Sequence, residues 1–248
     1  MTKRVALVTG GTGGIGSAIC RELAGLGHIV VAGYYPPEKE LSEVWQQRKK
    51  DKGFDIALVP MDVSSFEDCE RAVAEISEKY GPVEILVNCA GITRDGTLKK
   101  MSEENWQAVM STNLDSVFHV TRHVINGMLD KGWGRIINVA SVNGQRGQFG
   151  QANYASAKAG MHGFTMAVAL ETAAKGITVN TVSPGYVATA MTEAMPKEVL
   201  EAIINSVPMR RMGKPEEIAH AVAWLASEDN AYTTGANIPV NGGLFTSH

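Results

Sequence analysis

The sequence has few of the features that mark specialised classes of protein. Its 248 residues include three cysteines and no C-x-x-C pair. They include no apolar run long enough to span a bilayer. The 23 Lys and Arg residues nearly balance the 26 Asp and Glu residues, giving a formal net charge of -3. We therefore expect no disulfide scaffold, no membrane partner and no nucleic-acid partner, since the last two are normally met by clustered basic residues.

Signals for metal binding and for targeting are also lacking. The six histidines form no H-E-x-x-H motif, and the pair His119 and His123 has no third ligand nearby in the sequence, so no metal site is expected. The first apolar run, Val5–Val8, is too short for the core of a signal peptide. These absences favour a reduced, cytoplasmic protein.

What is present is an alternation of strand and helix patterns over residues 1–248, which we expect to form a single domain. Stretches with helical periodicity, two of them stopped by Gly27 and Gly81, separate short runs rich in Val and Ile. The seven expected strands are Val5–Val8, Ile29–Ala32, Ile56–Pro60, Ile85–Val87, Ile136–Val139, Thr178–Val182 and Ile238–Val240. This order predicts an α/β fold with a doubly wound, mostly parallel seven-stranded sheet and helices on both faces.

One segment resembles an insertion. Residues 186–212 hold four Met and two Pro residues between the sixth strand and a helix that Pro215 should open. We expect this segment to be a substrate lid.

A glycine-rich loop follows the first expected strand. Thr9–Gly16 reads TGGTGGIG and leads directly into an amphipathic helix. Glycine lets the backbone approach a ligand closely, and the N-terminus of the helix offers unpaired N–H groups to an anion. In this strand–loop–helix context the pattern predicts a Rossmann-type site for the pyrophosphate of a dinucleotide.

The residues after the second strand bear on the choice of dinucleotide. An acidic residue that would bind the ribose 2′-hydroxyl of NAD is absent from residues 32–37, AGYYPP, and no carboxylate occurs before Glu38. Lys39 lies within reach of a 2′-phosphate, although it could equally be an ordinary surface residue. We expect NADP(H) to be the favoured cofactor, and NAD(H) stays open as the alternative.

A Tyr–Lys pair provides candidate chemistry. Tyr154 and Lys158 stand one helical turn apart, thirteen residues after Ser141 at the end of the fifth strand. An ammonium beside a phenol lowers the pKa of the phenol by favouring the phenolate. The pair is therefore a candidate general acid/base.

Together these residues resemble the short-chain dehydrogenase/reductase family over essentially the whole chain. The resemblance is carried by Thr9–Gly16, Asn88-Cys89-Ala90-Gly91, Asn113, Ser141, Tyr154-x-x-x-Lys158 and Pro184-Gly185. Cys89 departs from the Asn more usual at that position, a change we expect to be harmless.

The resemblance implies four catalytic residues. Ser141 would hold the carbonyl oxygen, Tyr154 would donate the proton, Lys158 would bind the nicotinamide ribose and tune Tyr154, and Asn113 would carry a proton-relay water. The cofactor-binding residues expected, with Lys39 added from the argument above, are Gly10, Gly14, Ile15, Gly16, Lys39, Asp62, Val63, Asn88, Ala90, Gly91, Tyr154, Lys158, Pro184, Gly185, Val187 and Thr189.

Within the family the sequence is most similar to reductases that act on acetoacetyl-CoA in polyhydroxyalkanoate synthesis. The similarity lies in 91–95, GITRD, and in 141–151, SVNGQRGQFGQ. The substrate-binding residues expected are Asp95, Lys100, Gln148, Phe149, Gln151 and Tyr186, with the segment around Met191 and Met195 closing over a four-carbon chain. The resemblance also implies an R-configured 3-hydroxyacyl-CoA product and a homotetramer.

Two alternatives remain open at this point. A 3-oxoacyl-acyl-carrier-protein reductase of fatty acid synthesis has nearly the same catalytic residues. A non-catalytic cofactor-sensing protein of the same fold is the rival from another class, and it would usually lack the Tyr or the Lys that this chain retains.

Overall fold

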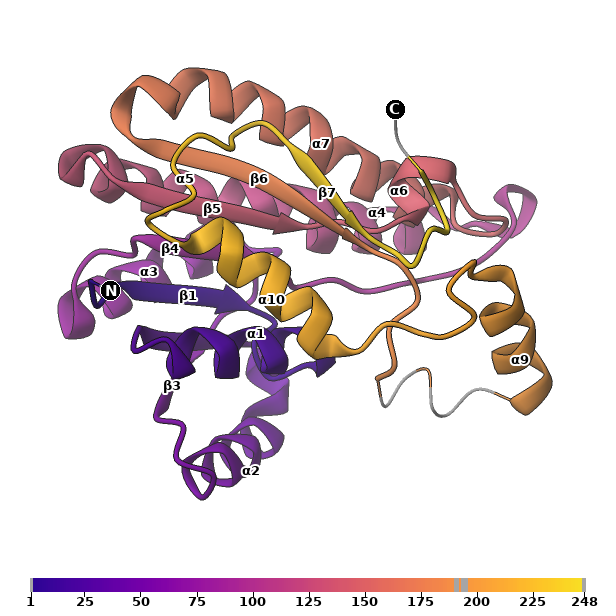
Figure 1. Ribbon diagram of the computed structural model, residues 1–248, viewed down its shortest axis with the longest axis horizontal. Coiled ribbons are helices and arrows are strands. Elements are labelled where there is room, and N and C mark those ends of the chain that lie inside the picture. The colour runs from indigo at the N-terminus through magenta and orange to yellow at the C-terminus, as the bar shows by residue number, and fades with distance from the viewer. Residues whose placement is uncertain (1, 190–191, 193–195, 247–248) are drawn as a thin grey trace.

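The computed structural model describes residues 2–189, 192 and 196–246, and its centre is a seven-stranded sheet (Figure 1). The order is β3-β2-β1-β4-β5-β6-β7, and every neighbouring pair is parallel. The strands are β1 (Val5–Thr9), β2 (Ile29–Tyr34), β3 (Ile56–Pro60), β4 (Ile85–Asn88), β5 (Gly134–Val139), β6 (Ile177–Pro184) and β7 (Asn237–Val240). The predicted doubly wound sheet is confirmed, and its pairing is parallel throughout.

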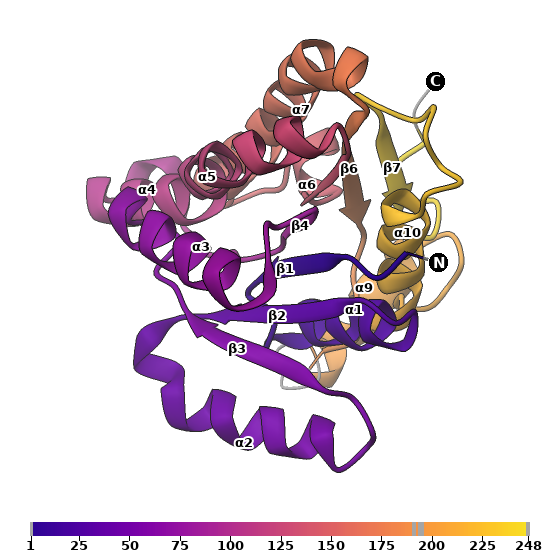
Figure 2. The same cartoon turned by 90° about the vertical axis from the view of Figure 1, so that its left-hand side faces the viewer.

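Helices cover both faces of the sheet (Figure 2). On one face lie α1 (Gly14–Gly25) and α10 (Pro215–Ala226), which share a hydrophobic cluster with Ala6 and Val8 of β1. On the other face lie α3 (Phe66–Tyr80), α5 (Ser116–Lys131) and α7 (Ala152–Thr172), which share a cluster with Val5 and Leu7. Successive residues of β1 therefore enter opposite cores, as the two-residue period of a strand requires.

The remaining helices are shorter or peripheral. They are η1 (Pro36–Glu38), α2 (Lys39–Lys50), η2 (Leu98–Lys100), α4 (Glu103–Met110), α6 (Asn143–Arg146), η4 (Ala173–Lys175) and α9 (Lys197–Ser206), with a π-helical turn η3 (Ser111–Asp115) between α4 and α5. Among the described residues no helix is long and apolar enough to cross a membrane. Nor do they contain a group of three metal-ligating side chains.

Local sequence accounts for the helix boundaries. The Ser65 hydroxyl accepts a hydrogen bond from the Asp68 backbone N–H at 3.1 Å and so caps α3, which ends before Gly81 at a φ of 97°. Pro215 opens α10 as predicted.

The strand order reverses next to β1, which pairs with β2 on one side and β4 on the other. In an open parallel sheet the loops diverge at such a point and leave a crevice beyond the carboxyl ends of the strands.

The expected lid spans the least fully described part of the chain. Within 186–212 the structure describes α9, which stands outside the layers of the sheet (Figure 1). Met191 and Met195 lie outside the described residues.

Candidate active site

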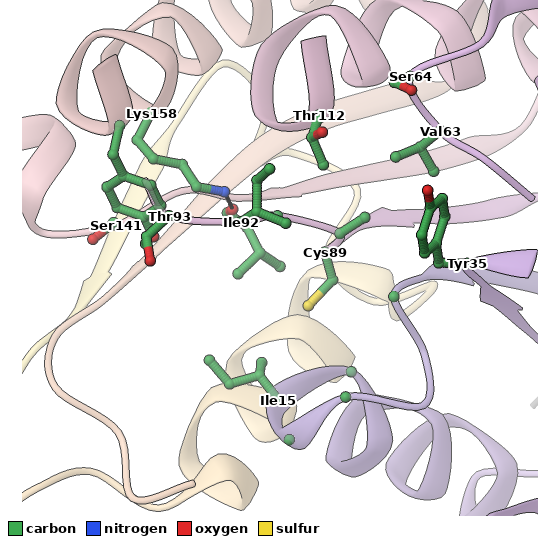
Figure 3. Close-up of a pocket in the computed structure, with 18 of the residues that line it drawn as sticks. Ile15, Tyr35, Val63, Ser64, Cys89, Ile92, Thr93, Thr112, Ser141 and Lys158 are labelled. Carbon is green, nitrogen blue, oxygen red and sulfur yellow. Dashed lines mark hydrogen bonds between the residues drawn. The ribbon is translucent and has the colours of Figure 1, made fainter. Parts of the chain in front are cut away.

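A cavity of about 990 Å³ lies at the carboxyl ends of the strands, where the order reverses. Its walls come from the loops that follow β1, β2, β3, β4, β5 and β6. Figure 3 shows Ser141 and Lys158 at one end of the cavity and Tyr35, Val63 and Ser64 at the other, with Ile15 and Cys89 between them. The elongated shape suits a ligand that is longer than a simple metabolite.

The glycine loop forms a cradle along one wall of this cavity. Gly10 adopts a φ of +62°, and an added Cβ at Gly14 would lie 2.8 Å from Thr189 Cγ2. A Cβ at Gly16 would collide with the backbone carbonyl of Gly10. No side chain caps α1 at Gly13, and its first turn carries no acid, so its N–H groups stay open to an anion. The cradle therefore fits the pyrophosphate of a dinucleotide.

Thr9 joins the two strands that flank the switch point. Its Oγ1 accepts hydrogen bonds from the backbone N–H groups of Cys89 and Ala90, at 3.0 and 3.1 Å. The loop after β4 is thus held against the glycine loop. Burial raises the pKa of the Cys89 thiol to about 11, so this unusual residue is a protonated, inert wall of the cavity.

Asn88 does not line the cavity, but it belongs to a buried hydrogen-bond network that joins the strands next to the site. Its Nδ2 donates to Asn138 Oδ1 at 2.9 Å, and Asn138 Nδ2 donates to Thr165 Oγ1 at 2.9 Å. Thr165 in turn bonds Thr181 at 2.8 Å. Because Asn88, Asn138 and Thr181 are in register, this buried network crosses β4, β5 and β6 and reaches α7.

Three of the expected catalytic residues meet at the other end of the cavity. Ser141 follows β5, and α7 begins at Ala152, so Tyr154 and Lys158 lie on its first two turns. The Ser141 hydroxyl acts to lower the pKa of Tyr154, and Ser141 Oγ accepts from the Asn143 backbone N–H at 3.1 Å. The Lys158 side chain is 3% exposed, and its Nζ donates to the Val139 carbonyl at 2.9 Å.

The pKa shifts correct one expectation. Burial raises the pKa of Tyr154 above 10, and the hydrogen bond with Ser141 only opposes that effect. Lys158 Nζ lies 5.7 Å from the centre of the Tyr154 ring, and burial lowers its own pKa to about 8. The pKa of Tyr154 is therefore raised on balance, because desolvation outweighs the effects that favour the phenolate. The phenol keeps its proton at neutral pH, as a proton donor requires.

Asn113 reaches the site through the π-helical turn, an element that the sequence patterns do not reveal. The fully buried side chain clamps Ile92: Oδ1 accepts from the Ile92 N–H and Nδ2 donates to the Ile92 carbonyl, both at 2.8 Å. An added Cβ at Gly91 would lie 2.9 Å from Asn113 Oδ1 and 3.5 Å from Lys158 Nζ. The missing side chain of Gly91 thus leaves the space between Asn113 and Lys158 open.

The expected substrate residues behave differently from one another. Gln151 uses both ends of its amide: Nε2 donates to the Asp95 carboxylate at 3.0 and 3.1 Å, and Oε1 accepts from Asn143 Nδ2 at 2.9 Å. Asn153 Nδ2 donates to the Arg94 carbonyl at 3.0 Å. These amides bind the loop after β4 to the start of α7, and the bridge from Asp95 to Gln151 lies outside the lining of the cavity.

The other substrate residues lie farther out. Lys100, Gln148 and Phe149 are exposed, Phe149 by 87%, and none of the three lines the cavity. Tyr186 is half-buried and also lies outside the lining. The structure therefore does not bring the amide of Gln148 or the ring of Phe149 to the catalytic end.

Most of the expected cofactor residues do line the cavity. They are Gly10, Gly14, Ile15, Gly16, Asp62, Val63, Ala90, Gly91, Tyr154, Lys158, Pro184, Gly185 and Thr189. Val187 is buried in a bridge with Gly213 instead. The Lys39 side chain is 67% exposed, lies 3.8 Å from Glu43 and does not line the cavity, because α2 begins there and turns it outward.

Several lining residues are absent from the sequence prediction. Among them are Tyr34, Tyr35, Glu38, Met61, Ser64, Ile92, Thr93, Arg94, Ser111 and Thr112. Tyr34, Tyr35 and Met61 come within three residues of the end of an expected strand, and that position was the one available indication.

The fold and the site define a dinucleotide-dependent oxidoreductase, and comparison with known proteins gives the family. The family model for short chain dehydrogenase matches residues 4–199, so the chain belongs to that family. It is therefore an NAD(P)-dependent oxidoreductase.

Three relatives match nearly the whole chain. An acetoacetyl-CoA reductase of Allochromatium vinosum is 62% identical over 98% of each chain. An acetoacetyl-CoA reductase of Cupriavidus necator is 52% identical over 98% of this chain and 99% of its own. A 3-oxoacyl-acyl-carrier-protein reductase of Haemophilus influenzae is 45% identical over the full length of both.

Proposed function

We propose that this enzyme reduces a short 3-oxoacyl-CoA, namely acetoacetyl-CoA, to the (R)-3-hydroxyacyl-CoA. The observation that carries the proposal is the meeting of Ser141, Tyr154 and Lys158 at one end of a cavity whose other wall is the glycine cradle. The identity of 62% and 52% to two acetoacetyl-CoA reductases supports the choice of substrate.

The chain's own residues account for the proton transfer to the carbonyl oxygen and for the stabilisation of the charge that develops there. A reduced nicotinamide supplies the hydride to the carbonyl carbon when the cofactor is bound. Ser141 donates a hydrogen bond to the carbonyl oxygen, where negative charge develops, and Tyr154 gives that oxygen its phenolic proton. Lys158, with a pKa of about 8, is mostly protonated at pH 7 and stabilises the phenolate that Tyr154 becomes. Asn113 holds the loop of Ile92 and is proposed to order the water that returns a proton.

A direct test follows from the proposal. Protein mixed with acetoacetyl-CoA and a reduced nicotinamide cofactor should lose the nicotinamide absorbance and yield (R)-3-hydroxybutyryl-CoA, identified by chiral chromatography. A non-catalytic cofactor-sensing protein would bind the cofactor and leave the absorbance unchanged.

The second candidate is reduction of the same acyl group on an acyl carrier protein. The full-length match at 45% identity to a reductase of that class supports it. The higher identity to the two acetoacetyl-CoA reductases favours the CoA thioester, and with it a place in polyhydroxybutyrate synthesis.

We propose further that the enzyme is a cytoplasmic homotetramer in which 186–212 serves as a substrate lid. Large apolar side chains are exposed on α5 and α7, namely Phe118, Leu129, Met166 and Leu170. This exposure supports burial against other copies of the chain. The three cysteines are all free thiols, which is consistent with a reducing compartment.

The expectation of NADP(H) rests on the absence of an acidic residue from 32–37 and on Lys39. That side chain points away from the cavity toward Glu43, so its position gives NADP(H) no support.

A further inference from the structure

The hydroxyl of Ser141 has to donate a hydrogen bond in the proposed reaction, and a neighbouring residue bears on its direction. Ser141 is buried and lines the cavity near Lys158 (Figure 3). A serine hydroxyl has one donor hydrogen and two acceptor lone pairs. The Asn143 backbone N–H donates to Ser141 Oγ at 3.1 Å, which occupies a lone pair and leaves the hydrogen free for the carbonyl oxygen of a substrate. The position of Asn143 therefore affects where the Ser141 hydroxyl points.

Asn143 is the first residue of α6, a helix of only four residues. A helix of one turn has few internal hydrogen bonds, so contacts with other elements decide its position. The Asn143 side chain is buried, and its Nδ2 donates to Gln151 Oε1 at 2.9 Å. Because Gln151 is the N-cap residue of α7, this bond ties the start of α6 to the start of the helix that carries Tyr154.

The carboxylate of Asp95 sets the direction of these hydrogen bonds. Gln151 Nε2 donates to the two Asp95 oxygens at 3.1 and 3.0 Å. An ionised carboxylate only accepts, so Gln151 presents its NH₂ group to Asp95 and its carbonyl oxygen to Asn143. Asn143 must then present its own NH₂ group, and its Oδ1 is left buried with no hydrogen-bond partner among the described residues. We call these three side chains, Asp95, Gln151 and Asn143, the amide bridge.

The exposed end of the amide bridge is fixed by the backbone around it. The Gly96 N–H donates to the Gly150 carbonyl at 2.8 Å on one side of Asp95. On the other side, the Arg94 carbonyl accepts from Asn153 Nδ2 at 3.0 Å. Since the loop after β4 is joined to the start of α7 on both sides of Asp95, the carboxylate is a fixed end point for the bridge.

None of the three side chains of the amide bridge lines the cavity, so the bridge can affect the reaction only through a residue that does. Resting on the proposed function, we propose that Asn143 is a positioning residue for Ser141. The amide bridge holds the start of α6 so that the Ser141 hydroxyl donates to the substrate carbonyl, where negative charge develops. Loss of the bridge therefore lowers kcat and leaves cofactor binding unchanged.

Reversal of the amide bridge tests this inference. Asn143→Asp places a carboxylate at each end of Gln151, so one end of that amide loses its partner. Removal of one donor to a developing oxyanion costs about 10²–10³-fold in kcat, and the donor is here displaced, so we expect a fall of about 10–100-fold.

The double variant Asp95→Asn/Asn143→Asp restores matching partners, with the Gln151 amide turned round. It should regain at least about fivefold in kcat over Asn143→Asp, as one recovered hydrogen bond predicts. The buried carboxylate at position 143 is common to both variants, so the gain reports the direction of the bridge alone. Asp95→Asn by itself keeps an acceptor oxygen for Gln151 and should stay within about threefold of the wild type.

Arg146→Gln is the matched control, because it changes an exposed side chain of the same short helix. Its kcat should stay within about twofold of the wild type. The Kd of NADH and of NADPH should also stay within about twofold in every variant, since the bridge lies outside the lining. Wild-type kcat in Asn143→Asp, a double variant no more active than Asn143→Asp, or a loss that appears equally in cofactor Kd would each overturn the inference.

Denaturant unfolding shows whether each variant is folded. If Asn143→Asp does not fold, Gln151→Leu removes both bonds of the partly exposed amide and should lower kcat by about 10-fold. Unchanged kcat in a folded Gln151→Leu would overturn the inference by this second route.

The choice of substrate separates this inference from the proposed function. A wild type that reduces only acetoacetyl-acyl-carrier protein would contradict the proposed substrate, and the same variants would then be compared on that thioester, whose carbonyl Ser141 meets in the same way. Turnover of neither thioester would contradict the proposed function. In that case a double variant no more stable to denaturant than Asn143→Asp would overturn the amide bridge itself.

Discussion

At the scale of single residues, Tyr154 carries the most specific claim. Tyr154→Phe removes the proton donor and keeps the ring, so kcat should fall by about 10²–10⁴-fold while the Kd of the cofactor stays near the wild-type value. Steady-state kinetics and cofactor titration measure the two effects. Retention of more than about a tenth of the rate would exclude Tyr154 as the proton donor.

The buried ammonium of Lys158 serves the proposed reaction, but its burial lowers the free energy of unfolding. Burial lowers its folded-state pKa to about 8 from 10.5, so the unfolded chain binds the extra proton more readily. The cost is complete below pH 8 and is relieved as pH rises from about 8 to 10.5. Lys158→Met should therefore raise the free energy of unfolding at pH 7 by about 1–3 kcal/mol, although it loses turnover.

Denaturant unfolding of the wild type and Lys158→Met at pH 7 and pH 10 checks the sign. The stability advantage of the variant should shrink at the higher pH. An advantage that grows with pH would contradict the assignment of Lys158 as a buried cation.

At the scale of elements, the amides at the start of α7 bind two loops together. Gln151→Ala should break the bridge from Asp95 to Asn143 and lower kcat/KM for acetoacetyl-CoA by roughly 10-fold, at about 1 kcal/mol for each lost hydrogen bond. Gln148→Ala is the matched control, because that amide is exposed and takes no part in the bridge. A larger effect of Gln148→Ala than of Gln151→Ala would restore Gln148 as a direct substrate contact.

The strands were predictable because parallel strands are buried on both faces and read as uninterrupted Val and Ile runs. The π-helical turn at Ser111–Asp115 was not predictable from the sequence, because no hydrophobic periodicity marks one extra residue in a helix. The contact of Asp95 with Gln151 joins positions 56 apart, and no local pattern contains it.

For Glu38 and Lys39, one position in the sequence decides which side chain lines the cavity, and no sequence pattern indicates which of the two it is. They are adjacent, yet neighbouring residues of a helix point about 100° apart, so one lines the cavity and the other faces solvent. The sequence drew attention to this segment, and the geometry of η1 and α2 decided which of the two side chains lines the cavity.

At the scale of the whole molecule, the exposed apolar side chains of α5 and α7 bear on assembly. Leu170 is 86% exposed, so Leu170→Glu should leave the monomer folded and shift a tetramer toward smaller species. Light scattering after size-exclusion chromatography measures the mass. Glu171→Gln is a control on the same helix, and an unchanged tetramer in Leu170→Glu would exclude this surface from the interface.

The central claim is that this oxidoreductase acts on a CoA thioester. The most direct measurement compares kcat/KM for acetoacetyl-CoA and for acetoacetyl-acyl-carrier protein, using the same enzyme and saturating cofactor. We predict a kcat/KM at least about 10-fold higher for acetoacetyl-CoA, with (R)-3-hydroxybutyryl-CoA as the product. A clear preference for the carrier protein would contradict the substrate assignment while leaving Ser141, Tyr154 and Lys158 in their roles.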